Sequence, residues 1–452
     1  MGGKTSQGEH AAAQAADQGR RSPQSQGVTS PALRAAFESR VAQLEGAALH
    51  ALHQLVACSS ETHDVAGVNR CGKITARLFE SLGFDPEFVA DPDQQRGDHL
   101  LLTRRAAGRP RVLLVSHLDT VYSRREVERR HFVWREEGPR IYGPGVIDIK
   151  GGTVLMYLVL ATMAAEAPDW LDAAEWVLAF NAEEETGSAD FPPLVRRAAR
   201  PTPLACLVFE HGHVRGERHS SLTISRRGAA RFRIEVQGRA AHSGSGHGRG
   251  ASAVLEMARL IEALEAMSDP AQHLTVNVGR IEGGSAINTV PERAVALVDL
   301  RADEPPIYER AVERILALAG EGTVRARDDG FACSIRVSRL PGYPPWPANP
   351  GSRRLAAIWE EAARSRGHVL LAEHRLGASD GCHLWDLAPT LDGLGPLGDD
   401  IHCATDDPAH GQRQESLLRS SLIDRALIHL EALGALLTGA ESPRQGADIR
   451  PH

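Results

Sequence analysis

The feature that most limits the possible folds is a series of short, continuously apolar segments separated by helical patterns. The segments are 111–116 (RVLLVS), 174–180 (AEWVLAF) and 204–209 (LACLVF), with helical patterns over 152–166 and 190–199 between them. Strands that are apolar on both faces are covered by helices on both sides of their sheet. This order therefore predicts an α/β domain with a largely buried, mostly parallel sheet.

The pattern changes from about residue 222 and then returns. The middle region alternates in the order β-α-β-β-α-β, which is typical of a ferredoxin-like unit that can fold by itself. Its elements are a strand at 229–236, a helix at 250–267, strands at 273–281 and 293–301, a helix at 305–319 and a strand at 331–338. Around this region we expect helices at 31–57, 64–82, 351–366, 380–387 and 413–437, and strands at 99–103 and 368–373.

These elements predict a larger catalytic domain in two parts, interrupted by a smaller inserted domain, which is called the lid below. A chain of 452 residues is too long for one ordinary core, which also favours two domains. Residues rich in Gln, Ala, Ser and Gly at the start, and the end of the chain, predict disordered tails. The expected boundaries are tails at 1–30 and 439–452, the catalytic domain at 31–218 and 339–438, and the lid at 219–338.

Composition excludes several classes of partner. The net charge is −7 and no basic block occurs, so neither nucleic acid nor an anionic membrane surface is expected to bind. We find no apolar run of the length needed for a membrane span. The six cysteines lie far apart and form no C-x-x-C pair, which argues against a zinc knuckle or a disulfide framework. A cytoplasmic location is the expectation.

Acidic and histidine residues follow the apolar segments at their carboxyl ends. His117 and Asp119 follow the first, the triplet 183–185 (EEE) follows the second, and Glu210 follows the third. The triplet alone could be a solvated acidic turn. However, ligands of an open α/β sheet bind outside the carboxyl ends of its strands, so these groups are expected to meet at one edge.

Two further segments are predicted to reach the same edge. A Gly-rich turn at 143–152 carries Asp148, and His402 follows the Gly-rich stretch 393–398. Many carboxylates in one place are costly unless cations neutralise them, and imidazole with carboxylate ligands suits Zn²⁺. The triplet is therefore interpreted as part of a metal site. Asp148 stands where a phosphate would need donors, which argues against a phosphate-binding loop.

In order and spacing, these residues resemble the di-zinc aminoacylase and glutamate carboxypeptidase family of metallopeptidases, which includes succinyl-diaminopimelate desuccinylase. The resemblance runs from about residue 45 to 437 and is closest to the glutamate carboxypeptidase branch. It implies a zinc-peptidase-like catalytic domain, and the inserted ferredoxin-like unit matches the family's lid and dimerisation domain. The motifs that carry it are H-x-D at 117–119, G-x-x-D-x-K-G-G at 145–152, E-E-x-G at 184–187 and Glu210.

The resemblance implies two zinc ions, with Co²⁺ or Mn²⁺ as substitutes. Asp148 would bridge the two ions. His117 and Glu210 would complete the ligands of one ion, and Glu185 and His402 those of the other.

The resemblance also implies roles for three acids around the metals. Asp119 would hold the ring of His117, Glu184 would act as the general base, and Glu183 is left with a structural role. The segment around His402 departs from the family pattern, because relatives have an acid soon after this histidine. Asp406, Asp407 and the more distant Glu415 follow here, and the rivals for the ligand are His383 and His410.

Two histidines beside Glu210 invite a metal interpretation that we do not adopt. His211 and His213 flank that acid, and they are interpreted instead as residues of an exposed loop.

In the lid, R-A-A-H-S-G at 239–244 resembles the motif whose histidine serves the partner subunit's site. His242 would then polarise the scissile carbonyl in a homodimer; the alternative is a surface histidine. The loop at 283–291 resembles the substrate-contacting loop, with Asn288 as the contact residue. Arg301 and Arg339 are candidate carboxylate clamps, with a slight preference for Arg339. A structural salt bridge explains Arg301 nearly as well.

The sequence thus predicts a zinc amidohydrolase that cleaves an amide next to a free carboxylate. Arginines near the hinge and lid also allow a second acidic group, as in glutamate; they are Arg218, Arg226, Arg227, Arg301 and Arg339. A carboxypeptidase of the glutamate carboxypeptidase type and an N-acyl-amino-acid deacylase are not distinguished. A catalytically silent binding relative is the alternative of another class, but it should have lost a ligand or Glu184, and neither loss is seen.

Overall fold

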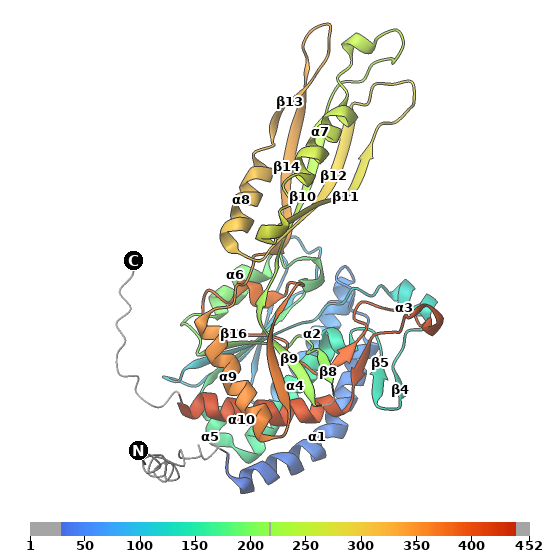
Figure 1. Cartoon of the computed structure of the whole chain (residues 1–452). Helices are drawn as coiled ribbons and strands as arrows, with labels where there is room; N and C mark the ends of the chain where they lie inside the picture. Colours follow the sequence, from blue (N-terminus) through green and yellow to red (C-terminus); the bar gives the residue numbers. More distant parts are fainter. Residues whose placement is uncertain (1–28, 217, 440–452) are drawn as a thin grey trace, which may run out of the picture.

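The computed structural model of the chain describes residues 29–216 and 218–439. Figure 1 shows a broad catalytic part with an elongated lid that extends away from it. The predicted disordered tails, 1–30 and 439–452, fall almost wholly outside the described residues.

The largest sheet lies in the catalytic part and has the strand order β1-β2-β6-β3-β7-β16. Strand β3 pairs in parallel with both β6 and β7, and β16 pairs in parallel with β7, whereas β1 and β2 are antiparallel additions. This arrangement confirms the predicted α/β class and the four predicted strands of the first half. The bounds are β1 Asp85–Val89, β2 His99–Arg104, β3 Arg111–His117, β6 Glu175–Asn181, β7 Ala205–Val208 and β16 Thr390–Leu391.

Helices cover both faces of this sheet. One face carries the main apolar core with α1, α2, α4, α9 and α10, and α6 packs on the other face. The start of α1 follows its predicted signal, because the Ser30 hydroxyl accepts a hydrogen bond from Leu33 N at 3.2 Å. The bounds are α1 Pro31–Ala57, α2 Val65–Glu80, α3 Arg124–Arg130, α4 Gly151–Glu166, α5 Pro168–Asp172, α6 Phe191–Ala198, α9 Pro350–Ser365 and α10 Ser420–Gly439.

One helical stretch corrects the expectation that no apolar run is long enough to cross a membrane. Val146–Glu166 has 21 residues and a mean hydropathy of 1.5, which meets the length and composition of a span. However, 89% of its apolar window is buried inside the protein. Helix α4 contacts both α1 and α10, so this stretch is the central helix of the catalytic core.

The lid is one antiparallel sheet with two helices on one face. Its strand order is β11-β12-β10-β14-β13, and α7 and α8 supply the apolar residues that cover it. The edge strand β13 was not predicted, so the lid has one strand more than the expected β-α-β-β-α-β unit. The bounds are β10 Gly228–Gln237, α7 Ala253–Glu265, β11 Thr275–Gly283, β12 Arg293–Ala302, α8 Pro305–Leu316, β13 Gly320–Arg325 and β14 Ala332–Tyr343.

A three-stranded sheet joins the two parts of the chain. Strand β9 (His219–Arg226) pairs in parallel with β15 (Val369–Arg375) and antiparallel with β8 (Val214–Gly216). The chain therefore enters the lid sheet at β10 and leaves it after β14. The predicted lid boundaries, 219 and 338, lie several residues before each of these changes.

A second small sheet corrects the predicted start of the last helix. Its order is β17-β18-β5-β4, from Gly398–Asp399, Ser416–Leu418, Arg140–Tyr142 and Arg135–Glu137. Residues 413–419 were predicted as helix, but β18 pairs with β5, so α10 begins at Ser420. Short helical turns complete the described chain at Val146–Lys150, Glu184–Thr186, His247–Arg249, Pro270–Gln272, Asp380–His383 and Pro408–His410.

Candidate metal centre and substrate cavity

The parallel strands deliver their polar residues to one edge of the sheet, as predicted. His117 is the last residue of β3 and lies in register with Asn181, the last residue of β6. The turn with Glu184 and Glu185 follows β6, and Glu210 comes two residues after β7. Parallel strands end at the same edge, and this brings the three segments together.

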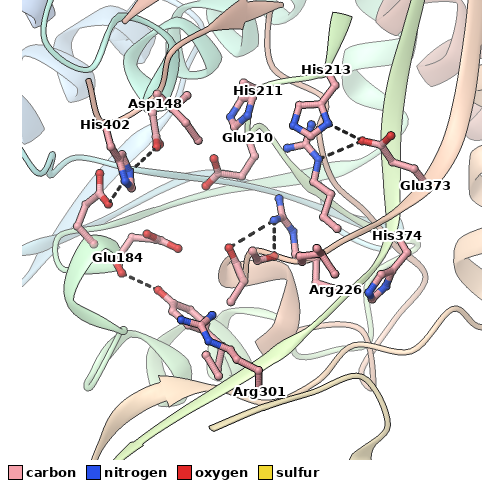
Figure 2. Close-up of a pocket in the computed structure, with 18 of the residues that line it drawn as sticks. Asp148, Glu184, Glu210, His211, His213, Arg226, Arg301, Glu373, His374 and His402 are labelled. Atoms are coloured by element: carbon pink, nitrogen blue, oxygen red, sulfur yellow. Dashed lines mark hydrogen bonds and ion pairs between the residues drawn. The ribbon is translucent and has the colours of Figure 1, made fainter. Parts of the chain in front are cut away.

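Asp148 occupies the centre of this group. Its Oδ1 lies 3.0 Å from Nε2 of His117, and its Oδ2 lies 3.1 Å from Nε2 of His402. Asp148 is buried, and Figure 2 shows it beside His402 at one end of a cavity. One carboxylate thus has a different histidine at each of its two oxygens.

Each histidine also faces a second carboxylate. Nε2 of His117 lies 3.7 Å from Oε1 of Glu210, and Nε2 of His402 lies 3.3 Å from Oε2 of Glu185. The structure therefore forms two groups of two carboxylates and one imidazole, which share Asp148. Ligand atoms of His117, Asp148 and Glu185 lie within 4.8 Å of one another.

The electrostatics of this group fit bound divalent cations. Burial, followed by the nearby charge of Asp148, raises the pKa of Glu185 to about 7 and that of Glu210 to about 8. Buried carboxylates of this kind are unfavourable as anions unless positive charge is close. Imidazole nitrogens and carboxylate oxygens are ligands of zinc and similar ions, so the residues present suit a metal centre.

Asp119 connects the metal-ligand groups from behind. Its Oδ1 lies 3.4 Å from Nδ1 of His117, and its carboxylate accepts hydrogen bonds from Glu184 N and Glu185 N at 3.2 Å each. Thr62 Oγ1 donates a further hydrogen bond of 2.7 Å. The acid lies where it can orient the imidazole ring, as predicted, and it also fixes the glutamate turn.

The three consecutive glutamates point to three different places. Glu183 is buried, forms a 2.9 Å ion pair with Arg96 and accepts a hydrogen bond from Asp190 N at 2.6 Å. Glu184 and Glu185 both line the cavity, but the carboxylate of Glu185 faces His402. Burial raises the pKa of Glu184 well above its ordinary value. Glu184 is thus the triplet member free to act in the cavity.

His402, and neither of its two rivals, is placed at Asp148. His383 is buried elsewhere, with its ring 5.1 Å from that of Tyr343. His410 is exposed and bonds Asp407 Oδ2 through Nδ1 at 2.8 Å.

The prediction that His211 and His213 belong to an exposed loop is wrong for His211. His211 is only 8% exposed and lines the cavity. His213 is partly exposed and pairs with Glu373 at 3.0 Å.

The cavity next to these residues has a volume of about 580 Å³ and is lined by both parts of the chain. Figure 2 shows Glu184 and His402 at one end, Glu373 and His374 at the other, and Arg301 on a third side. The lid contributes Ala229, Arg231, Arg301 and Tyr343, and the catalytic part contributes Asp148, Glu184, Glu185, Glu210, His211, His213, Arg215, Arg226, Glu373, His374, Arg375, Leu376, Gly377, Ala378, Ile401 and His402.

The two predicted carboxylate clamps have different surroundings. Arg301, near the end of β12, lines the cavity and pairs with Asp299 at 2.8 Å. Arg339 lies on β14, donates a 2.9 Å hydrogen bond to Tyr308 Oη and is not among the residues that line the cavity. The structure therefore corrects the slight preference for Arg339 and favours Arg301.

His242 and Asn288 lie next to each other but not at the cavity of their own chain. Ser243 N donates a 2.9 Å hydrogen bond to Asn288 O, and both side chains are exposed. Strand β10 begins at the cavity with Ala229 and leads away along the lid to the loop that holds His242 (Figure 1). A strand of ten residues spans about 30 Å, so this pair belongs to the far end of the lid.

Comparison with known proteins agrees with this arrangement. A family model described as a peptidase dimerisation domain matches residues 224–326, which cover the end of β9 and most of the lid. Carboxypeptidase G2 from Pseudomonas sp. (strain RS-16) is 25% identical over 358 residues, which cover 79% of this chain and 83% of that protein. These matches confirm the predicted resemblance to peptidases of the M20 family.

Solved structures of peptidases share this fold. A metallo-carboxypeptidase of the M20 family from Sulfolobus solfataricus has a TM-score of 0.64 at 13% identity, covering 86% of this chain and 99% of that one. A tripeptidase from Staphylococcus aureus has a TM-score of 0.63 at 19% identity, covering 87% and 99%. The likeness to carboxypeptidase G2 supports a hydrolase, and the carboxylate and histidine cluster is a candidate site for a divalent metal.

Sequence reasoning missed one acid of this site. Glu415 is buried, and its Oε1 accepts hydrogen bonds from Ile147 N at 2.9 Å and Asp148 N at 3.2 Å, while its Oε2 accepts one from Tyr122 Oη at 2.6 Å. It therefore holds the backbone that presents Asp148. The signal was present, because Glu415 is the next glutamate after His402, but the longer spacing hid it.

Proposed function

We propose that this protein is a zinc-dependent carboxypeptidase of the glutamate carboxypeptidase type, which cleaves an amide bond next to a free carboxylate. The observation that supports it most is the position of Asp148 between His117 and His402, with Glu184 beside them in the cavity. The likeness to carboxypeptidase G2 favours this substrate class.

Two metal ions would be held by the residues that share Asp148. One set is His117, Asp148 and Glu210, and the other is His402, Asp148 and Glu185. When bound, such ions supply Lewis-acid chemistry that polarises the scissile carbonyl and lowers the pKa of water.

Glu184 has the position of the general base. Its carboxylate faces the cavity, and its backbone is fixed by Asp119 and by a 2.6 Å hydrogen bond from Tyr343 Oη to its carbonyl. It takes a proton from the attacking water on a carboxylate oxygen and passes it to the leaving nitrogen. A pKa raised by burial suits a group that must hold this proton.

The guanidinium group of Arg301, on the lid side of the cavity, would bind the substrate's carboxylate. Arg301 lines the cavity, and a guanidinium can bind a carboxylate through two parallel hydrogen bonds. Binding of the carboxylate by the lid and of the carbonyl by the catalytic part would align the amide with Glu184.

We also propose that the active protein is a homodimer in which His242 serves the partner's site. Nδ1 of His242 accepts hydrogen bonds from Gly244 N and Ser245 N at 3.1 Å each, so the ring proton resides on Nε2. This Nε2–H is then available to donate to a carbonyl brought by another chain. The match of the lid to a peptidase dimerisation domain supports this assembly.

An assay with controlled metal content tests the proposed function. Metal-depleted protein, reloaded with zinc and checked for metal content, is incubated with C-terminal dipeptides and N-acyl amino acids and with their methyl esters. We expect zinc-dependent cleavage of the amide bond in the free acids. Cleavage of the same amide bond should be much slower in the methyl esters. A preference for N-acetyl amino acids over dipeptides would favour the alternative, an N-acyl-amino-acid deacylase. The absence of hydrolysis in zinc-loaded protein would contradict both.

A further inference from the structure

The wall of the cavity opposite the lid carries charged residues that the proposed mechanism does not use. They come from β15, from β8 and from the segment that connects β7 to β8, and they are His211, His213, Arg215, Glu373 and Arg375. Figure 2 shows His211 and His213 above Glu373, on the opposite side of the cavity from Arg301. This second wall therefore lies next to Glu210 of the metal centre.

Glu373 holds this wall together. Its Oε1 accepts a hydrogen bond of 2.6 Å from Ser221 Oγ and pairs with His213 at 3.0 Å and with Arg375 at 3.3 Å. Its Oε2 accepts from Arg215 at 2.5 Å. A single carboxylate thus serves two guanidinium groups, and one positive charge is left over.

Arg375 carries the unsatisfied donor. Its side chain is 94% buried, since 6% of it is exposed, and its Nη2 has no hydrogen-bond acceptor among the described residues. Nδ1 of the buried His211 also has no partner there. Buried polar groups are nearly always satisfied, so two unpaired polar atoms in one cavity wall indicate a ligand that supplies their partner.

A neighbouring arginine shows the contrast. Arg226 also lines the cavity, but it pairs with Asp392 through Nε at 2.7 Å and Nη2 at 2.6 Å. Its charge is compensated within the protein, whereas that of Arg375 is compensated only in part. The free positive charge of this wall is therefore located at Arg375.

We propose that Arg375 and His211 form a subsite for a second carboxylate of the substrate, distinct from the carboxylate beside the scissile amide. This inference rests on the proposed function and narrows its substrate class to amides that carry two acidic groups. The two carboxylates would bind to opposite walls, one at Arg301 of the lid and one at Arg375 of the catalytic part. Guanidinium and carboxylate are matched in shape and charge, and a buried site strengthens the contact.

The second carboxylate can belong to the released amino acid or to the acyl group of the substrate. Pairs of substrates that differ only in this carboxylate distinguish the two cases. One arm compares benzoyl-glutamate with benzoyl-glutamine, which differ in the side chain of the released amino acid. The other compares succinyl-leucine with its terminal amide, which differ in the acyl group. In one of these two comparisons we expect kcat/KM of the acidic substrate to exceed that of the amide by roughly 10–150-fold. This is the effect expected from one charge-assisted hydrogen bond.

Variants assign this preference to the proposed residues. Arg375→Gln should reduce the acid-to-amide ratio to near one, His211→Phe should lower it, and Arg375→Lys should restore part of it. Arg425→Gln is the matched control. Arg425 is equally buried in the same part of the chain, but it donates to the backbone carbonyls of Gly395, Ser221 and Gly393, outside the cavity. Its ratio should equal that of the unmodified protein, even if its stability falls.

Binding measurements separate this inference from the proposed function. Calorimetric titration with glutamate against glutamine, and with succinate against succinamate, reports the subsite without hydrolysis. Tighter binding of one acid that is lost in Arg375→Gln supports the subsite even if no amide is cleaved. Acid-to-amide ratios near one in both arms, or a ratio unchanged in folded Arg375→Gln, would overturn it while leaving a hydrolase for monoacidic substrates.

Discussion

Neighbouring residues with the same side chain have different environments in this protein. Glu183, Glu184 and Glu185 are consecutive, yet one pairs with Arg96, one faces the cavity and one faces His402. The turn after β6 separates them, because its backbone is bonded to Asp119. The role of each glutamate therefore depends on the direction in which its side chain points. Substitutions of these adjacent glutamates should have different consequences.

The first prediction concerns the proposed base. Glu184→Gln should keep its bound metal, because Glu184 lies outside both metal-ligand groups, while kcat falls by about 10²–10⁴. Metal analysis of the purified variant and steady-state kinetics check this together. Glu183→Gln is the control, and it should lose stability through the Arg96 ion pair while keeping most of its activity. Loss of metal from Glu184→Gln would instead give it the role assigned to Glu185.

A second prediction concerns the two candidate clamps. Arg301→Ala should lower kcat/KM for a substrate with a free carboxylate by roughly 10–150-fold, because a charge-assisted contact is lost. The same variant should differ little from the unmodified protein on the methyl ester. Arg339→Ala, whose guanidinium bonds Tyr308, should lose stability and retain the preference for the free acid. The reverse result would return the clamp to Arg339.

Secondary-structure elements position groups that are far apart in the sequence. Strand β18 pairs with β5, and this pairing carries Glu415 to the backbone of Ile147 and Asp148, more than 260 residues earlier. Strand β15 pairs with β9 and places Glu373 within reach of Ser221. The walls of the site are thus built from pairs of distant strands, and single acids link them.

A third prediction tests the first of these links. Glu415→Ala leaves two backbone N–H groups and the Tyr122 hydroxyl without their acceptor and frees the turn that carries Asp148. Outer residues that orient ligands typically contribute 10–100-fold to metal affinity, so zinc should bind about that much more weakly. Competition with a chelator measures the change. Tyr122→Phe removes only one of the hydrogen bonds and should have a smaller effect; equal affinity in Glu415→Ala would contradict this role.

A fourth prediction follows from the ionisation of Glu373. Its burial acts to raise its pKa, but hydrogen bonds from Ser221 and Arg215 outweigh burial and lower the pKa to about 2. A glutamate in an unfolded chain has a pKa of about 4.3. A lowered pKa stabilises the fold above the unfolded value, and this stabilisation disappears as pH falls through the folded value.

At neutral pH the Tm of the unmodified protein should therefore be higher than that of Glu373→Gln. This difference in Tm should vanish as the pH falls from about 4 to about 2. Thermal unfolding of both proteins over this range is the measurement. A difference in Tm that persists unchanged at the lowest pH would mean that packing, rather than charge, holds β8, β9 and β15 together.

At the scale of the whole molecule, the length of the lid decides which sites its loops can serve. The cavity lies at the base of the lid, and His242 and Asn288 lie at the loops reached by β10, about 30 Å further on. A second chain packed against the lid would bring these loops to a cavity. Catalysis and assembly are then linked through one element.

A fifth prediction tests this link. His242→Ala and Glu184→Gln should each be inactive, but an equimolar mixture after subunit exchange should recover about a quarter of the original activity, because half of the dimers are mixed and each has one intact composite site. Mixing each variant with itself is the control. A purified mixed dimer without activity would place His242 outside the partner's site.

The sequence alone determined the fold class and the main members of the candidate metal centre. Apolar runs and helical periods give strands and helices directly, and a carboxyl end of a parallel strand is a known place for ligands, so His117, Glu185 and Glu210 could be predicted from local pattern. Asp148 and His402 needed motif spacing as well, and the structure brings both to the predicted edge.

Other features depended on long-range pairing, which leaves little local signal. The edge strand β13, the burial of His211 and the positions of Arg301 and Arg339 follow from which strands meet and which way their side chains face. A shift of one residue along a strand reverses that direction. The roles of Glu415 and Arg375 arise only when strands separated by about 150 residues or more pair with each other. Tertiary structure decided these because the free energy of such contacts belongs to the assembled fold and to no single segment.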